Sequence, residues 1–272
     1  MPPARRAPHG RPGTRRPAPA GTVPLARALS KRGLASRAEA IDLILAGRVR
    51  VDGRVVRDPG LAVVPERLAV AIDDAPITAP AWRAIALYKP RGVVTTRRDP
   101  AGRPTVHDLV APLGDGLAPA GRLDLASTGL LVCTNDTRLA AWLTDPATGV
   151  EKEYVVTVRG PLDTATVARL AEGVRDDGEW LRPRSMTLLK ASARESQVAV
   201  VLTEGKNREI RRIFASAGRD VTRLLRVRIG GLTLGTLGPG AWRDIRQEKL
   251  ADYFPEYSDG RSRRPRRTDP AR

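Results

Sequence analysis

Cysteine and histidine are scarce in this sequence. The 272 residues include one cysteine, Cys133, and two histidines, His9 and His107. A disulfide within the chain is therefore impossible, and a cluster of thiolate metal ligands is excluded. Because His9 lies in a segment rich in proline and arginine, neither a zinc site nor a Ser-His-Asp triad is expected. Any acid, base or nucleophile should be a carboxylate, a tyrosine or a lysine.

Long apolar runs and cofactor-binding motifs are also missing. No stretch reaches the roughly 18 uninterrupted apolar residues that a membrane-spanning helix needs, and the N-terminus lacks the apolar centre of a signal peptide. No glycine-rich phosphate loop or nucleotide-binding fingerprint occurs. We therefore expect a cytoplasmic protein that has no membrane partner and uses no metal and no cofactor.

Positive charge dominates the composition. Lysine and arginine number 47 against 30 aspartates and glutamates, which gives a formal net charge of +17 at pH 7. Such an excess favours binding to RNA or DNA, with a membrane surface as the competing partner. Both ends are dense in arginine and proline without hydrophobic periodicity, so residues 1–22 and 254–272 are predicted to be disordered basic tails. These tails either bind phosphates loosely or have no specific role.

Residues 23–72 have the pattern of a small separate module. Apolar residues at helical spacing predict two short helices. The first should end at Gly33, and the second should begin at Ser36, which would form a capping box with Glu39. Alternating residues around Asp52-Gly53 then predict a β-hairpin with a two-residue turn. The expected order is helix, helix, hairpin.

Basic residues cluster in this module, at Lys31, Arg32, Arg37, Arg48 and Arg50. With Ser36-Arg37 opening a helix and the run from Gly47 to Gly53 after it, the module resembles the small RNA-binding domain first named for a ribosomal small-subunit protein. The resemblance implies that Arg37, Arg48 and Arg50 contact RNA phosphates, which supply affinity rather than sequence choice. The alternative is a basic helical hairpin packed against the larger domain.

The remaining chain is predicted to contain a linker at residues 73–82 and a larger domain at residues 83–253. Strand-like runs outnumber helical ones and do not alternate regularly with them. This pattern favours an α+β fold with a mixed, largely antiparallel sheet and flanking helices over a doubly wound sheet. The predicted strands are 85–88, 128–134, 153–158, 185–189, 197–202 and 223–229, and the predicted helices are 163–172 and 207–217.

Asp124 is the carboxylate best placed for chemistry. It follows the turn-rich residues 119–121 and precedes the apolar strand 129–133. A carboxylate at such a junction would lie at the mouth of a cleft. However, an aspartate in a turn more often caps a helix or accepts bonds from backbone donors. The residue by itself leaves both interpretations open.

Four segments of the larger domain carry motifs in a fixed order. They are Lys89-Pro90-Arg91-Gly92-Val93-Val94 followed by Gly102-Arg103-Pro104-Thr105-Val106, then Gly121-Arg122-Leu123-Asp124 with Ser127, Gly129 and Leu130, then Glu151-Lys152-Glu153-Tyr154, and last Gly205-Lys206-Asn207-Arg208-Glu209-Ile210-Arg211-Arg212. In order and spacing they resemble the bacterial ribosomal RNA pseudouridine synthases of the RsuA type, over residues 83 to 247. The resemblance implies a pseudouridine synthase fold and an isomerase that converts a specific uridine of ribosomal RNA to pseudouridine, with an aspartate nucleophile and base flipping.

The resemblance also assigns three catalytic roles. It makes Asp124 the nucleophile, which attacks either the sugar or the pyrimidine ring. It makes Arg211 the cation paired with Asp124, because a guanidinium in contact favours an ionised carboxylate and can hold it bidentately. It makes Tyr154 the ring stacked on the flipped base, with a core tyrosine as the alternative.

Further basic residues are expected to contact the RNA. Arg122 would fill the gap left by the flipped base or grip the backbone beside it. The other candidates are Lys152, Lys206, Arg208 and Arg212, and for the last three a solvated helix face is the alternative.

Three departures from the family pattern leave the position of the target uridine open. Tyr88 stands before Lys89-Pro90 where the family more often has asparagine. Residues 237–240 lack the basic residue that is common near this turn, and residues 24–26 lack an acidic one.

Two other classes of function remain open at this stage: a non-catalytic RNA-binding protein of ribosome assembly, and a DNA-binding regulator. A pure binder has no need for Asp124, Tyr154 and Arg211 together, and no repeat of recognition helices occurs. We therefore predict a monomeric, cytoplasmic pseudouridine synthase that acts on ribosomal RNA during ribosome biogenesis.

Overall fold

The computed structural model describes residues 22–32, 34–35, 37–65, 68–76, 81–114 and 116–257. The chain divides into two compact units, Met1–Thr78 and Ala79–Arg272, which we call the N-terminal and C-terminal units. The tails predicted at residues 1–22 and 254–272 lie outside the described residues, except for Thr22 and residues 254–257. The predicted helix stop at Gly33 and the N-cap at Ser36 lie outside them as well.

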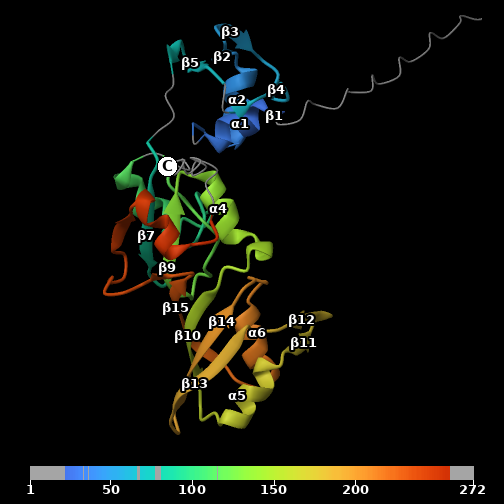
Figure 1. The fold of residues 1–272 in the computed structure, drawn as a ribbon, viewed down its shortest axis with the longest axis vertical. Helices are drawn as coiled ribbons and strands as arrows, with labels where there is room; N and C mark the ends of the chain where they lie inside the picture. Colours follow the sequence, from blue (N-terminus) through green and yellow to red (C-terminus); the bar gives the residue numbers. More distant parts are fainter. Residues whose placement is uncertain are drawn as a thin grey trace, which may run out of the picture. The chain divides into compact units, whose positions relative to one another are not determined.

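The described residues of the N-terminal unit form two short helices and two small sheets (Figure 1). The helices are α1 (Leu25–Lys31) and α2 (Arg37–Leu45). One sheet has the strand order β3-β2-β5-β6, and β1 pairs with β4 in the other. The strands are β1 (Val23–Pro24), β2 (Val49–Val51), β3 (Arg54–Val56), β4 (Ala62–Val63), β5 (Val70–Ile72) and β6 (Ala75–Pro76).

Local sequence explains most of this unit. Leu25 and Leu29 on α1 pack with Ile44 on α2, and all three are fully buried. Strands β2 and β3 are joined by Asp52-Gly53. These two residues have φ angles of 49° and 78°, as a tight hairpin turn requires.

The sheet of the N-terminal unit extends past residue 72, where the sequence pattern placed the end of the module. Ile72 pairs with Ala75 in β6, and the turn between them holds Asp73 and Asp74 at φ angles of 52° and 62°. Aspartate tolerates this left-handed region because its short side chain can bond locally. Residues 73–76, predicted as part of the linker, therefore belong to this sheet.

A nine-stranded sheet forms the centre of the C-terminal unit. Its main path is β13-β14-β10-β15-β9-β7-β17, with β16 beside β15 and β8 beside β9. The pair β9–β15 is parallel, and the other pairs in this sheet are antiparallel. The predicted α+β class with a mixed, largely antiparallel sheet is confirmed. The strands are β7 (Ala84–Lys89), β8 (Ala118–Pro119), β9 (Thr128–Thr134), β10 (Lys152–Arg159), β13 (Ser185–Ala191), β14 (Glu195–Leu202), β15 (Val221–Ile229), β16 (Leu232–Thr233) and β17 (Trp242–Ile245).

Helices and one hairpin flank this sheet. Within the unit, α5 lies beside β13 and α4 beside β9 (Figure 1). The elements are α3 (Val106–Val110), α4 (Thr137–Thr144), α5 (Thr164–Ala171), α6 (Glu209–Ser216), α7 (Leu250–Tyr253), the short 3-10 helices η2 (Ala111–Leu113), η3 (Pro146–Thr148) and η4 (Gln247–Lys249), and the hairpin of β11 (Val174–Asp176) and β12 (Glu179–Leu181). None of the helices in the described part of the chain has the length and apolar character needed to cross a bilayer.

Strands β7 and β9 are buried on both faces. On β7, Ile85 and Leu87 belong to one core cluster, while Ala84 and Ala86 belong to another. On β9, Leu131 belongs to the cluster of Ile85 and Leu87, and Leu130 belongs to the cluster of Ala84 and Ala86. Alternate side chains of a strand point to opposite faces, so the two strands separate two apolar layers. This makes them a rigid base for the loop that precedes β9.

Gly129 allows β9 and β15 to approach closely. It lies opposite Arg226 in the parallel register and has a φ of +108°. A Cβ at this position would lie 2.2 Å from the carbonyl oxygen of Arg226. A side chain at residue 129 would therefore push apart the two strands that carry Arg226 and the segment after Asp124.

Candidate active site

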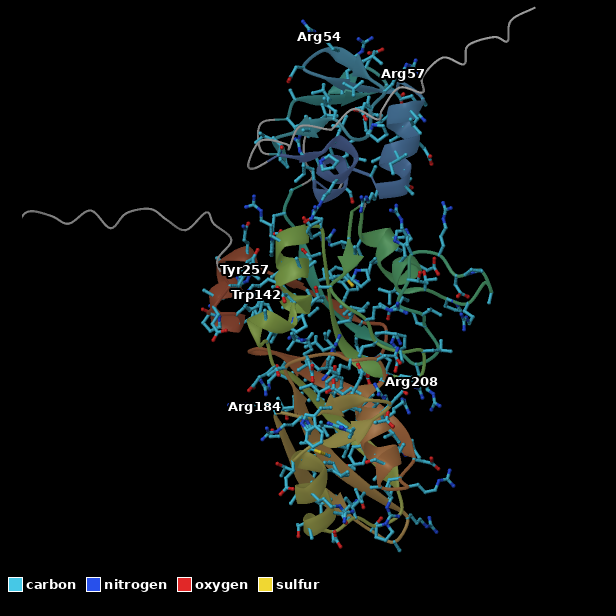
Figure 2. The ribbon with its side chains drawn as sticks, turned by 90° about the vertical axis from the view of Figure 1, so that its right-hand side faces the viewer. Arg54, Arg57, Trp142, Arg184, Arg208 and Tyr257 are labelled. Carbon is cyan, nitrogen blue, oxygen red and sulfur yellow. The ribbon has the colours of Figure 1, made fainter. Side chains whose placement is uncertain are left out.

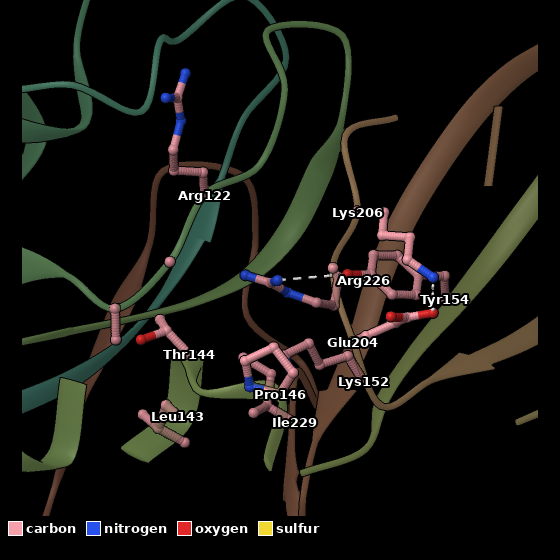
Figure 3. Close-up of a pocket in the computed structure, with 13 residues that line it drawn as sticks. Arg122, Leu143, Thr144, Pro146, Lys152, Tyr154, Glu204, Lys206, Arg226 and Ile229 are labelled. Carbon is pink, nitrogen blue, oxygen red and sulfur yellow. Dashed lines mark hydrogen bonds and ion pairs between the residues drawn. The ribbon is translucent and has the colours of Figure 1, made fainter. Parts of the chain in front are cut away.

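A basic pocket of about 390 Å³ opens in the C-terminal unit (Figure 3). Four cations line it, and they come from the loop before β9, from β10, from the loop before α6 and from β15. A tyrosine and one carboxylate join them. The residues are Arg122, Lys152, Lys206, Arg226, Tyr154 and Glu204.

Asp124 lies on a loop at residues 121–127, which we call the Asp124 loop. Asp124 itself is exposed, and the pocket lining reaches Arg122 of this loop but not Asp124. Backbone bonds fix the loop: Gly92 N donates to Leu125 O at 2.9 Å, and Ser127 N donates to Asp124 O at 3.0 Å. Among the described residues, the Asp124 carboxylate receives no hydrogen bond. The loop is thus held by its main chain, and the carboxylate remains accessible.

Lys89 fixes the Asp124 loop through hydrogen bonds to main-chain carbonyl oxygens. Its side chain is fully buried, and Nζ donates to the carbonyl oxygens of Pro90, Asp124 and Ser127 at 3.0, 3.1 and 2.9 Å. Burial lowers the pKa of Lys89 to about 8, although the charge of Asp124 acts in the opposite direction. Lys89 belongs to one of the sequence motifs, but no role was predicted for it. The available signal was a lysine at the end of the apolar strand that contains residues 85–88.

Arg211 lies on α6, near Asp124. Nη1 donates to Val221 O at 2.8 Å, while Nε is buried and has no hydrogen-bond partner among the described residues. Burial lowers the pKa of Arg211, and Arg208 adds to this effect, whereas the charge of Asp124 raises it. The two side chains therefore interact electrostatically, but the described residues include no direct ion pair between them. Direct pairing with Asp124 stays a prediction.

Tyr154 and Arg226 form the inner part of the pocket. Tyr154, on β10, is 8% exposed, and Arg226, on β15, is 4% exposed. Arg226 Nη1 lies 3.5 Å from the Tyr154 hydroxyl, and its guanidinium carbon lies 6.0 Å from the ring centre. Arg226 was not predicted as a site residue. The signal was its position two residues after Leu224, which places it on the same, buried face of a strand.

Comparison with known proteins identifies the family of this chain. It is 36% identical over 227 residues to an uncharacterized RNA pseudouridine synthase of Aquifex aeolicus, covering 83% of this chain and 91% of that protein. It is 39% identical over 232 residues to the ribosomal large subunit pseudouridine synthase B of Escherichia coli, covering 81% and 78%. The chain belongs to the RNA pseudouridine synthase family. The RNA pseudouridylate synthase model matches residues 83–216 of this synthase, and the S4 domain model matches residues 23–67.

A solved structure agrees with this assignment. The synthase resembles a protein described as "Crystal structure of pseudouridylate synthase", with a TM-score of 0.60 and 27% identity over 84% of this chain and 98% of that one. The predicted RsuA-type family, the N-terminal RNA-binding domain and the isomerase class are therefore confirmed. No group of three or more histidine, cysteine or acidic residues able to hold a metal occurs in the described residues of the synthase.

The structure places the other predicted RNA contacts in different surroundings. Arg122, Lys152 and Lys206 line the pocket, whereas Arg208 lies on the exposed surface (Figure 2). Arg212 pairs with Asp176 and Glu179 and so ties α6 to the β11–β12 hairpin.

In the N-terminal unit of the synthase, the predicted arginines also differ in their partners. Arg48 pairs with Asp73 at 2.6 Å, and Arg50 pairs with Asp74 at 2.5 Å. Arg37 is exposed. All three remain candidates for phosphate contacts, but RNA would have to compete with Asp73 and Asp74 for two of them.

Two lysines of the pocket are tuned by their neighbours. Burial lowers the pKa of Lys152, Arg226 lowers it further, and Glu209 raises it. Lys206 Nζ donates to Glu204 at 2.8 Å and to Trp180 O at 2.8 Å. In the pocket of the synthase, Lys206 is therefore paired with a carboxylate, whereas Lys152 lies near the cation Arg226.

Replacing the buried Glu209 of the synthase by glutamine should stabilise it at pH 8. Glu209 Oε2 accepts a bond from Lys206 N, but Oε1 is buried without a partner among the described residues. Burial, followed by the charge of Glu204, raises the pKa of Glu209 from 4.5 to about 7. Its contribution to stability is therefore complete below pH 4.5 and is lost as the pH rises through 7.

Urea unfolding of the Glu209→Gln variant tests this expectation. At pH 8 the variant should gain roughly 1–3 kcal/mol in the free energy of unfolding, because no charge has to be buried. At pH 4.5 the gain should vanish. An equal change at both pH values would contradict the assigned cause.

Proposed function

We propose that this synthase isomerises a specific uridine of ribosomal RNA to pseudouridine, with Asp124 as the nucleophile and the target base flipped out of its stack. The carrying observation is the Asp124 loop, which holds an accessible carboxylate beside a basic pocket that contains Tyr154. Ribosomal RNA is supported as the substrate by the name of the Escherichia coli relative, a ribosomal large subunit pseudouridine synthase.

The chemistry needs few groups. The N1 glycosidic bond of uridine must break, the uracil must turn, and C5 must bond to the sugar, so no energy source is required. An accessible carboxylate can attack either the sugar or the ring. Arg211 supplies positive charge close to Asp124. We propose these two residues and Tyr154 as the catalytic set.

Base flipping fits the shape and lining of the pocket. A base pulled from its stack loses contacts that an aromatic ring can replace, worth about 1–3 kcal/mol per base. The Tyr154 ring is available for this role at the pocket wall. Arg122, Lys152 and Lys206 would meet the phosphates on either side of the flipped nucleotide, and Arg208 and Arg212 would lie further along the RNA.

The N-terminal unit would bind RNA separately from the chemistry. Arg37, Arg48 and Arg50 are its proposed phosphate contacts. We further expect the synthase to act as a monomer in the cytoplasm.

A pseudouridine map of ribosomal RNA tests the proposal. Cells that lack this chain should lose pseudouridine at one or a few uridines of ribosomal RNA, and the purified protein should restore it on RNA from these cells. Loss in transfer RNA alone would overturn the proposed substrate. An unchanged map, together with RNA binding by the purified protein, would support the non-catalytic alternative.

A further inference from the structure

Arg226 has a donor that the folded chain leaves unused. Its Nε donates to Leu130 O at 2.7 Å, which ties β15 to β9, and Nη1 lies 3.5 Å from the Tyr154 hydroxyl. Nη2 is buried and has no hydrogen-bond partner among the described residues. Figure 3 shows the guanidinium pointing into the pocket. One face of Arg226 thus supports the sheet, and the other faces the space where a ligand would bind.

This arrangement is unfavourable without a ligand. A buried donor without an acceptor loses about 1–3 kcal/mol relative to its hydrated state, and more when it is charged. The surroundings do not compensate, because Arg226 also acts on two neighbouring cations and lowers the pKa of both Lys89 and Lys152. An acceptor oxygen that enters the pocket would satisfy the free N–H and offset the crowded positive charge.

We propose that Arg226 Nη2 donates to a carbonyl oxygen, O2 or O4, of the target uracil; the inference rests on the proposed function. Tyr154 would stack on the base, and Arg226 lies toward the hydroxyl end of its ring. A uracil on that ring would project a carbonyl beyond the ring edge to the guanidinium. Guanidinium only donates, so it matches either oxygen. A contact at O4 would also select uracil, because cytosine carries an amino group at C4 but shares the O2 carbonyl.

A base carbonyl fits this position better than a phosphate. Arg226 is 4% exposed, whereas Arg122 is exposed and Lys206 is only half-buried. A flipped nucleotide would insert its base into the buried end and keep its charged backbone near solvent. Phosphates should therefore meet Arg122 and Lys206, and the base should meet Arg226.

The same contact would assist the reaction by either route of attack. Attack at the sugar breaks the N1–C1′ bond and leaves its electron pair on uracil, where the charge spreads to O2 and O4. Attack at C6 of the ring pushes a pair onto O4 instead. In both routes the N1–C1′ bond breaks, C5 bonds to C1′, and the bond from Asp124 to C1′ or C6 breaks again to release the carboxylate. The C5 proton leaves and N1 takes up a proton. A donor fixed beside a carbonyl oxygen binds it more strongly as this charge develops.

Sulfur substitution in the substrate tests the contact. The substrate is an RNA fragment that carries the mapped uridine, or 2-thiouridine or 4-thiouridine in its place, and it is assayed with the wild-type chain and with Arg226→Gln and Arg226→Lys. With the wild type, kcat/KM should fall about 10- to 100-fold for one of the two thio substrates, because sulfur accepts hydrogen bonds poorly. In either variant kcat/KM should fall on the normal RNA, and the thio effect should shrink to less than about 3-fold.

The outcomes separate three cases. If the wild type does not form pseudouridine on the unmodified fragment, the proposed function fails before Arg226 is tested. If it does, and neither thio substitution slows it, the carbonyl contact is overturned without any variant having to fold. The contact is also overturned if the thio substitution lowers kcat/KM in both Arg226 variants as much as in the wild type. Sensitivity to a phosphorothioate at the target nucleotide that disappears only in the Arg226 variants would assign Arg226 to a phosphate instead.

Discussion

Replacing Asp124 by asparagine should reduce pseudouridine formation by at least about 1,000-fold, because an amide cannot attack the uridine as a carboxylate does. The change should leave folding almost unaffected, since Asp124 is exposed and its side chain accepts no bond in the described part of the chain. RNA affinity should stay close to that of the wild type. The measurement is the rate of pseudouridine formation on ribosomal RNA, together with a thermal melt and an RNA-binding curve.

Asp177 provides a matched control for this substitution. It is also an exposed aspartate, at the turn of the β11–β12 hairpin, with a φ of 47° that asparagine tolerates equally well. Asp177→Asn should keep the full rate. If Asp124→Asn retains more than a tenth of the wild-type rate, Asp124 is a turn aspartate and not the nucleophile.

Replacing Lys89 by methionine should lower kcat/KM by about 100-fold or more, because a shift of about 1 Å in a reacting group can cost this much. Methionine fills the space but cannot donate to Pro90 O or Ser127 O, so the Asp124 loop loses its support. The variant should lose less stability than activity. Methionine removes hydrogen bonds, but it also removes the cost of burying a charge, which the depressed pKa of Lys89 reflects.

Lys152→Met is the comparison for stability. This lysine is half-buried, whereas Lys89 is fully buried, and Lys152 donates to one carbonyl, Val150 O, at 3.3 Å. Limited proteolysis should cut the Asp124 loop faster in the Lys89 variant than in the Lys152 variant. Equal protection of the loop in both variants, with normal turnover for Lys89→Met, would contradict the positioning role of Lys89.

The pH dependence of Lys89 gives a second readout. Above pH 8 the amine loses a proton, so it has two N–H groups for three carbonyls, and the positive charge near Asp124 disappears. Activity should therefore decline above pH 8. Because the folded-state pKa is depressed below 10.5, the contribution of Lys89 to stability moves the other way and rises between pH 8 and 10.5. If activity and the contribution of Lys89 to stability both fell above pH 8, alkaline unfolding would be the cause instead.

The regular elements were predictable because their signals are local. The continuous apolar run within residues 128–134 matches β9 residue for residue, and the strand predicted at 153–158 is extended by one residue at each end in β10. Helix α4 was missed. It begins with the side chain of Asp136 capping Arg138 N and Leu139 N, and it is only eight residues long.

The two buried cations of the site could not be predicted in this way. Lys89 is explained by acceptors that lie 35 and 38 positions away, and Arg226 by an acceptor 96 positions away. A lysine or arginine in a strand pattern is read as solvated unless these distant partners are known. Arg212 shows the opposite case: its basic helix face suggested phosphate, but Asp176 and Glu179 are nearer partners.

The hydrogen bonds from Lys89 to the Asp124 loop affect the reactivity of the Asp124 carboxylate. A carboxylate held by direct hydrogen bonds has its lone pairs engaged, and these bonds must loosen before it can act on an electrophile. Lys89 instead bonds to the main-chain oxygen of Asp124, so it supplies orientation and charge without occupying either carboxylate oxygen. Among the described residues, the lone pairs of Asp124 therefore accept no hydrogen bond, so the carboxylate that we propose as the nucleophile is positioned through its main chain while its oxygens stay available to a substrate.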